Sequence, residues 1–163
     1  MSDDVTIPNF GELLATHIAK LPPESMPGLL AQLERSAGDR YREWALDIES
    51  QRDGLLACAG REDDIANRVD ALFPIREEHQ PLVDEIVPLA IETFLGVYSG
   101  LSSIQQITIQ ANAERQGASA WRGLVEAYPQ FAGDLESLAK TEESNADYLD
   151  ALLANSQENK PAS

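Results

Sequence analysis

The chain has 163 residues, of which 28 are acidic and 12 are basic, and its net charge at pH 7 is −16. This length suffices for one domain with a real core, and a hydrophobic content of 43 % lies outside the composition of disordered proteins. The charge argues against nucleic-acid binding, because a phosphate backbone would repel the chain and no basic stripe offsets that repulsion. Basic protein partners fit the charge better.

Cysteine usage and the N-terminus point to a reducing compartment. Cys58 is the only cysteine, so no intramolecular disulfide can form. Residues 1–5 are acidic and do not lead into an apolar run behind a basic segment, as a classical signal peptide would. We therefore expect a cytoplasmic protein.

The first half of the chain has helical spacing of its apolar residues. Residues 1–6 should be disordered, and a short helix is expected over residues 8–21, ending at Pro22–Pro23. A second helix should begin with Ser25 as its cap and run to about Ala59, with a bend or end at Gly60 and a continuation over residues 62–73. Its 3–4 alternation predicts a coiled-coil-like seam along another helix, formed by Ala37, Tyr41, Trp44, Ile48, Gln51, Leu55 and Cys58.

A long helix is expected over residues 82–128, with Pro81 in its first turn. Residues 93–113 carry no charged side chain, and apolar stripes on two sides of the first half predict burial on both sides. A kink at Pro88 and a break at Ser99–Gly100 both remain open. Glu92 lies inside the most apolar part, residues 86–104, so we expect no permanent membrane span.

Pro129 predicts a tight turn, and the last helix is expected over residues 130–153. Strand signals are scarce, and no internal repeat is evident. The sequence therefore predicts an all-α fold: an elongated antiparallel bundle of four to five helices, two of them long, with a C-terminal helical hairpin. We expect a single helical-bundle domain over residues 7–155 and a disordered tail over residues 156–163.

One set of polar residues interrupts the apolar seams. Glu114 takes a core-facing place between Ala111 and Ala118, and a chain reversal near Pro129 would put it opposite residues 143–145. The expected polar layer comprises Glu114, Glu142, Asn145 and Gln51. These side chains could reach water at the rim of the hairpin, form a buried layer that fixes register or receives a basic partner side chain, or bind a metal.

The metal interpretation lacks its usual motif. Ferritin-like di-iron proteins combine Glu with Glu-x-x-His pairs, whereas neither His17 nor His79 follows a glutamate by three residues. Phosphate-binding loops, nucleophile elbows and zinc-spaced Cys/His sets are also absent from the sequence. We therefore expect no metal ligands, no cofactor and no enzymatic activity.

The leading functional hypothesis is a non-enzymatic acidic interaction protein, such as an adaptor, regulator or chaperone-like protein. It would bind a basic protein partner and form a homo-oligomer through its helical seams. The alternative is a signal-less secreted or membrane-active helical protein that uses the uncharged segment 93–113. Trp121–Gly123 resembles the Trp-x-Gly of small helical-hairpin substrates of type VII secretion, but residues 1–75 have no counterpart there and we assign no family.

Overall fold

The computed structural model describes residues 4–158, so the predicted disorder of residues 1–3 and 159–163 lies outside the described range. Over that range the chain forms six α-helices joined by turns and four short 3₁₀ helices, with no strand, and the all-α prediction is confirmed. Residues 156–158, predicted to be part of a disordered tail, belong to the last helix. None of the helices in this part of the chain has the length and apolar content that a membrane span requires.

The helices belong to two compact units. One unit comprises Pro8–Ser99, and the other comprises the described parts of Met1–Ile7 and Gly100–Ser163. Each unit contains one long helical hairpin, and the expectation of a single domain over residues 7–155 stays a prediction.

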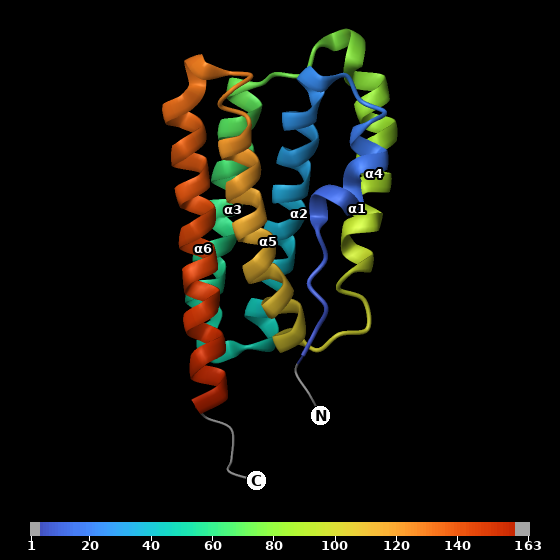
Figure 1. The fold of residues 1–163 in the computed structure, drawn as a ribbon. Helices are drawn as coiled ribbons and strands as arrows, with labels where there is room; N and C mark the ends of the chain where they lie inside the picture. The colour runs from blue at the N-terminus through green and yellow to red at the C-terminus, as the bar shows by residue number, and fades with distance from the viewer. Residues whose placement is uncertain (1–3, 159–163) are drawn as a thin grey trace. The chain divides into compact units, whose positions relative to one another are not determined.

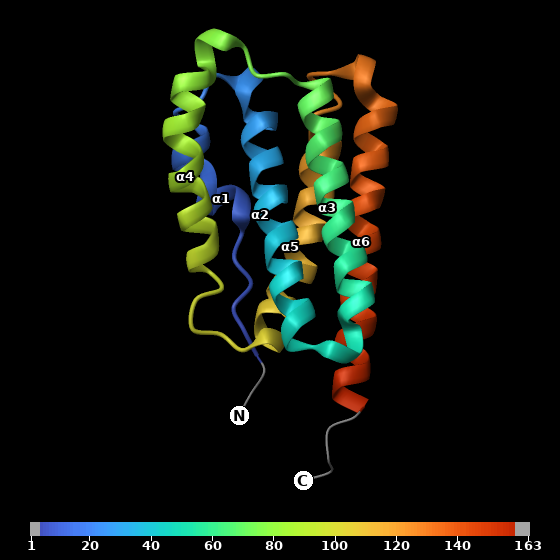
Figure 2. The same ribbon diagram turned by 180° about the vertical axis from the view of Figure 1, so that it is seen from behind.

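The N-terminal unit contains α1 (Phe10–Ile18), α2 (Met26–Asp47), α3 (Arg52–Leu72) and α4 (Gln80–Gly96). The helices α2 and α3 run antiparallel side by side, and α4 packs against α1 and α2 (Figure 2). The predicted helix at residues 8–21 is shorter than expected because Asn9 caps it, accepting a hydrogen bond from the backbone N–H of Glu12 at 3.0 Å. The predicted stop before Pro74 and the start near Pro81 both agree with the structure.

A turn divides the helix that was predicted to run from Ser25 to Ala59. Helix α2 ends at Asp47, the 3₁₀ helix Glu49–Gln51 reverses the chain, and α3 begins at Arg52. Gly60, where a break was expected, lies inside α3. The 3–4 spacing of apolar residues continues across the turn, and neither Pro nor Gly marks it, so the periodicity was wrongly interpreted as one helix.

A second turn divides the helix predicted over residues 82–128. Gly100 has a φ of +77°, a left-handed conformation that only glycine adopts at little cost. Helix α5 (Ser103–Gly123) then begins with a capping box, in which Ser102 and Gln105 exchange side chain–backbone hydrogen bonds at 3.2 and 3.0 Å. Of the two open alternatives, the break at Ser99–Gly100 is the one that occurs, whereas Pro88 lies within α4.

The C-terminal unit is the expected helical hairpin, formed by α5 and α6 (Ala132–Glu158) with the 3₁₀ helix Pro129–Phe131 between them (Figure 1). Its core contains Trp121 and a row of leucines and alanines from α6. The predicted turn at Pro129 and the predicted last helix are both present, although α5 ends at Gly123 and not at Tyr128.

The two hairpins correspond position by position at an offset of 80 residues, a correspondence that the sequence analysis did not find. The turns Glu49–Gln51 and Pro129–Phe131 match, and α3 and α6 begin at matching residues. Seven buried positions of α3 have buried counterparts in α6: Leu55, Cys58, Ala59, Glu62, Ile65, Ala66 and Val69 against Leu135, Leu138, Ala139, Glu142, Asn145, Ala146 and Leu149.

Interhelical ion pairs repeat at the same offset. Arg35 on α2 lies 2.5 Å from Asp70 on α3, and Arg115 on α5 lies 2.5 Å from Asp150 on α6. A second ion pair joins Arg42 to Asp63 in the N-terminal hairpin, and its counterpart joins Arg122 to Glu143 at 2.7 Å. Equivalent ion pairs at a constant offset require the same register in both hairpins, which supports an internal duplication.

Candidate functional site

Each hairpin carries two inward-facing glutamates at matching positions, one on each of its helices. The N-terminal hairpin has Glu34 on α2 and Glu62 on α3, and the C-terminal hairpin has Glu114 on α5 and Glu142 on α6. Glu62, Glu114 and Glu142 have 0 %, 2 % and 1 % of their surface exposed, and Glu34 is partly buried. Glutamate is almost never fully buried without a compensating interaction, so three such residues in one chain require an explanation.

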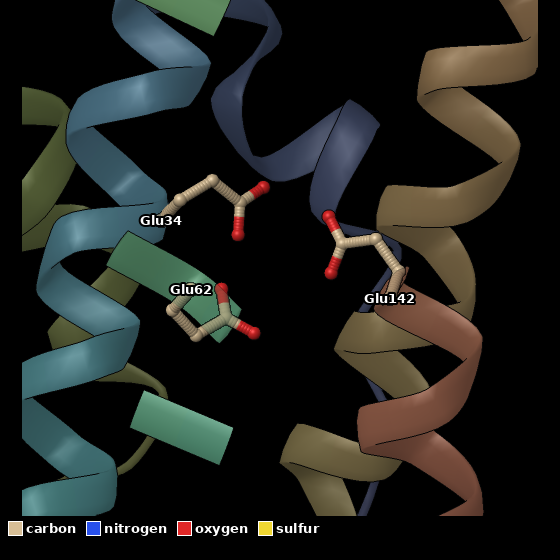
Figure 3. Close-up of side chains that lie close together, drawn as sticks. All are labelled: Glu34, Glu62 and Glu142. Atoms are coloured by element: carbon tan, nitrogen blue, oxygen red, sulfur yellow. The ribbon is translucent and has the colours of Figure 1, made fainter. Parts of the chain in front are cut away.

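The N-terminal pair consists of two carboxylates that lie close together. Carboxylate oxygens of Glu34 and Glu62 come within 4.8 Å of one another across the α2–α3 interface (Figure 3). Two like charges at that separation repel by about 3 kcal/mol at an effective dielectric constant of about 20. A cation held between the two carboxylates would relieve that repulsion, and so would a proton on one of them.

Each glutamate of the C-terminal pair accepts a hydrogen bond from a buried neutral side chain. Gln110 Nε2 donates to Glu114 Oε1 at 2.9 Å, and Trp121 Nε1 donates to Glu142 Oε1 at 2.8 Å, both in buried positions. Figure 3 shows the Glu142 side chain extending from α6. A Cβ atom added at Gly117, less than one turn beyond Glu114, would lie 2.8 Å from Glu142 Oε1, so the two glutamates lie within about one helical turn of the same level in the hairpin.

Three residues of the predicted polar layer are buried in the C-terminal hairpin, and the fourth belongs to the other unit. Glu114, Glu142 and the fully buried Asn145 lie on the two helices of the C-terminal hairpin, so the interpretation that both glutamates reach water at its rim is wrong. Gln51 ends the 3₁₀ turn Glu49–Gln51 of the other unit and is partly exposed. Its expected place in the layer depended on an unbroken helix from residue 25 to 59, and the turn removes that basis.

Sequence reasoning missed Glu34 and Glu62. Glu34 precedes Arg35 as Glu114 precedes Arg115, and Glu62 lies 80 positions before Glu142. This offset of 80 positions was the signal in the sequence from which the second pair could have been found. It was hidden because the turn at residue 129 begins with proline whereas the matching position carries Glu49.

On the outer surface of the C-terminal hairpin, an arginine near the turn joins α5 to α6. The Arg122 guanidinium donates to Glu136 at 2.9 Å and to Glu143 at 2.7 Å. Hydrogen bonding to Arg122 holds the pKa of both carboxyls below its usual range and raises the pKa of the arginine. These exposed contacts join Arg122 to two carboxylates on the outer face of α6.

The metal-ligand atoms that both glutamate pairs offer are carboxylate oxygens. Three residues beyond the second glutamate of each hairpin, where a Glu-x-x-His motif would place histidine, the chain carries Ile65 and Asn145. Carboxylate oxygens without imidazole or thiolate suit hard cations such as Mg²⁺ and Mn²⁺. The arrangement is thus chemically suited to holding divalent cations.

No protein-family model matches the chain, and comparisons with curated proteins and with solved structures find no significant match.

Proposed function

We propose that the protein binds divalent cations, one at the glutamate pair of each helical hairpin. The observation that carries this proposal is the approach of Glu34 to Glu62, whose carboxylate oxygens lie within 4.8 Å in a largely buried interface. The proposal departs from the sequence-based expectation of no metal ligand.

Two further features support it. Both glutamates of the pair recur at the matching positions of the second hairpin, although fewer than half of the residues around them are identical in the two copies. Burying a carboxylate is costly, and an apolar residue at these positions would pack without that cost. Retention of four glutamates in such places is therefore better explained by a ligand than by packing.

The experiment is a Mn²⁺ titration of the metal-free full-length protein, with free Mn²⁺ followed by electron paramagnetic resonance. We expect two saturable sites in the wild type and one in each of E62Q and E142Q. The matched control is E43Q, which neutralises an exposed glutamate of α2 and should keep both sites. Absence of saturable binding in the wild type, or two unchanged sites in both E62Q and E142Q, would contradict the proposal.

A second candidate function follows from the charge and the surface. A net charge of −16 favours a basic protein partner, and Leu46 and Leu56, which are 78 % and 39 % exposed, flank the α2–α3 turn. On this proposal the protein is a cytoplasmic, non-enzymatic interaction protein that self-associates. Light scattering after size exclusion at two salt concentrations tests it. A strict monomer with no salt-dependent binding to basic proteins would overturn it.

The alternative of a membrane-active protein uses the uncharged segment 93–113, which here comprises the end of α4, the turn at Gly100 and the first half of α5. Entry of this segment into lipid would require Phe94, Tyr98 and Ile107 to leave buried positions. Liposome binding at pH 5 compared with pH 7.5 tests this alternative, since protonation of carboxylates would lower the charge. Equal absence of binding at both pH values would dismiss it.

A further inference from the structure

Two leucines lie on the surface of the N-terminal hairpin where the corresponding hairpin carries acids. Leu46, in the last turn of α2, and Leu56, in the second turn of α3, are 78 % and 39 % exposed. The residues at the matching positions of the C-terminal hairpin are Glu126 and Glu136. Because a hairpin of the same register forms with glutamates at these positions, its packing does not require leucine there.

The correspondence of the two hairpins extends to their turns. The backbone N–H of Ile48 donates to the carbonyl of Trp44 at 2.8 Å, and that of Tyr128 donates to the carbonyl of Leu124 at 2.9 Å. The chain therefore leaves the first helix in the same way in both hairpins, although residues 124–127 form a turn and not α-helix. Positions 46 and 126 are both exposed, so they can be compared directly.

The two leucines lie on the same outer face of the hairpin. In the C-terminal hairpin, Arg122 donates to Glu136 at 2.9 Å across the α5–α6 interface. The matching residues Arg42 and Leu56 face one another across α2 and α3, because both hairpins have the same register. Leu46 follows Arg42 by one helical turn on the same side of α2. We call Leu46 and Leu56 the leucine patch.

The leucine patch is bordered by negative charge. Residues 43–53 contain one base and four acids, and these acids are all exposed: Glu43, Asp47, Glu49 and Asp53. Glu43 precedes Leu46 by three residues in α2, and Asp53 precedes Leu56 by three residues in α3, so each acid lies beside its leucine. A second copy of this chain would bring acids against acids here, whereas a segment with lysine or arginine would bring opposite charges together.

We propose that the leucine patch, with Glu43 and Asp53 at its border, is the docking surface for an amphipathic helical segment of a basic protein partner. The inference rests on the second candidate function and names its surface. The segment would cover the leucines with apolar side chains three or four positions apart and place basic side chains beside the acids. The described part of the chain has no strand whose edge an extended peptide could join, which favours a helical segment.

The test uses a dye-labelled peptide of about 15 residues, with leucines at helical spacing and lysines elsewhere, whose binding is followed by fluorescence anisotropy. L46E/L56E installs the residues of the other hairpin and should weaken binding about tenfold or more. The direction of this change is decisive. Two added negative charges would strengthen the binding of a cationic peptide that was held by general attraction alone.

The matched control is L89E/L95E, which adds the same charge at two leucines of α4 that are 42 % and 41 % exposed. This variant should bind the peptide at least as tightly as the wild type. L46E alone, which changes the more exposed leucine, should also weaken binding. E43Q/D53N should weaken binding at low salt and have less effect at high salt.

The outcomes separate this inference from the proposed functions. If the wild type binds neither the peptide nor basic proteins in a salt-dependent way, the second candidate function and this inference both fail. If the wild type binds the peptide and both L46E and L46E/L56E bind it as tightly, only this inference fails. A wild type that self-associates beside a monomeric L46E/L56E, measured by light scattering, would show that a second copy covers the patch and would overturn the inference. The Mn²⁺ titration is independent of all these results.

Discussion

Trp121 donates its indole N–H to Glu142 across the α5–α6 interface at 2.8 Å, and both side chains are almost completely buried. The bond gives a buried carboxylate a neutral donor from the facing helix. The residues at the matching positions of the N-terminal hairpin are Tyr41 and Glu62, which are buried as well.

Cation binding should raise the thermal stability of the protein. A ligand that binds only the folded protein stabilises it by RT ln(1 + [L]/Kd), or about 2.7 kcal/mol for one site at a concentration of 100 Kd. We therefore expect Mn²⁺ to raise the Tm of the wild type and not that of the double variant E62Q/E142Q, as measured by calorimetry.

The same variants should behave differently without metal. A neutral amide costs less to bury than a charged carboxylate, so E62Q should unfold at a higher temperature than the wild type in EDTA. A Tm of E62Q well below that of the wild type in EDTA would indicate that the carboxylate serves packing.

The pH dependence of stability should reveal the contacts of Arg122. The pKa values of Glu136 and Glu143 are lowered in the folded protein, chiefly by hydrogen bonding to Arg122. Their contribution to stability is therefore fully present above the unfolded value of about 4.5 and is lost as the pH falls through the lower folded value. We expect R122Q to have a lower Tm than the wild type at pH 7 and a smaller difference at pH 3.

The control for this experiment is R52Q, which removes an exposed arginine of α3. The difference in Tm between R52Q and the wild type should not become smaller from pH 7 to pH 3 in the same way. A deficit of R122Q that persists unchanged at pH 3 would mean that Arg122 stabilises the hairpin by packing of its stem and not through its carboxylate partners.

Replacing two glycines by alanine should change the free energy of unfolding in opposite directions. Gly100 has a φ of +77°, so G100A should destabilise the protein by about 1–2 kcal/mol. Gly60 lies inside α3 with no atom near the position of an added Cβ, so G60A should stabilise it by about 0.5–1 kcal/mol. Urea denaturation measures both changes, and a stabilising G100A would contradict the left-handed turn.

Truncating matching core residues of the two hairpins should destabilise the protein by similar amounts. Leu55 and Leu135 are both fully buried, and truncating either to alanine should cost about 2–5 kcal/mol of unfolding free energy. L46A, at a position that is 78 % exposed, should change it by less than about 0.5 kcal/mol. A small effect of L135A beside a large effect of L55A would show that the hairpins do not share one packing scheme.

Helical periodicity was sufficient to predict the all-α fold and the C-terminal hairpin, because apolar spacing and proline are local signals. It was not sufficient for the turns at Ile48–Gln51 and Gly100. The first carries neither proline nor glycine, and the 3–4 spacing runs through it. The second required a choice between Pro88 and Ser99–Gly100, which the sequence left open.

For the candidate site, the sequence by itself determined that Glu114, Glu142 and Asn145 interrupt an apolar seam at one level of a hairpin. The reason is that residues three or four positions apart lie on the same face of a helix. Only the tertiary structure decided that these residues are buried and that Glu34 and Glu62 form a matching pair. The reason is physical: a glutamate on a helix face is exposed or buried according to the neighbour that covers it. That neighbour was unknown until the turn at Ile48–Gln51 placed α3 against α2.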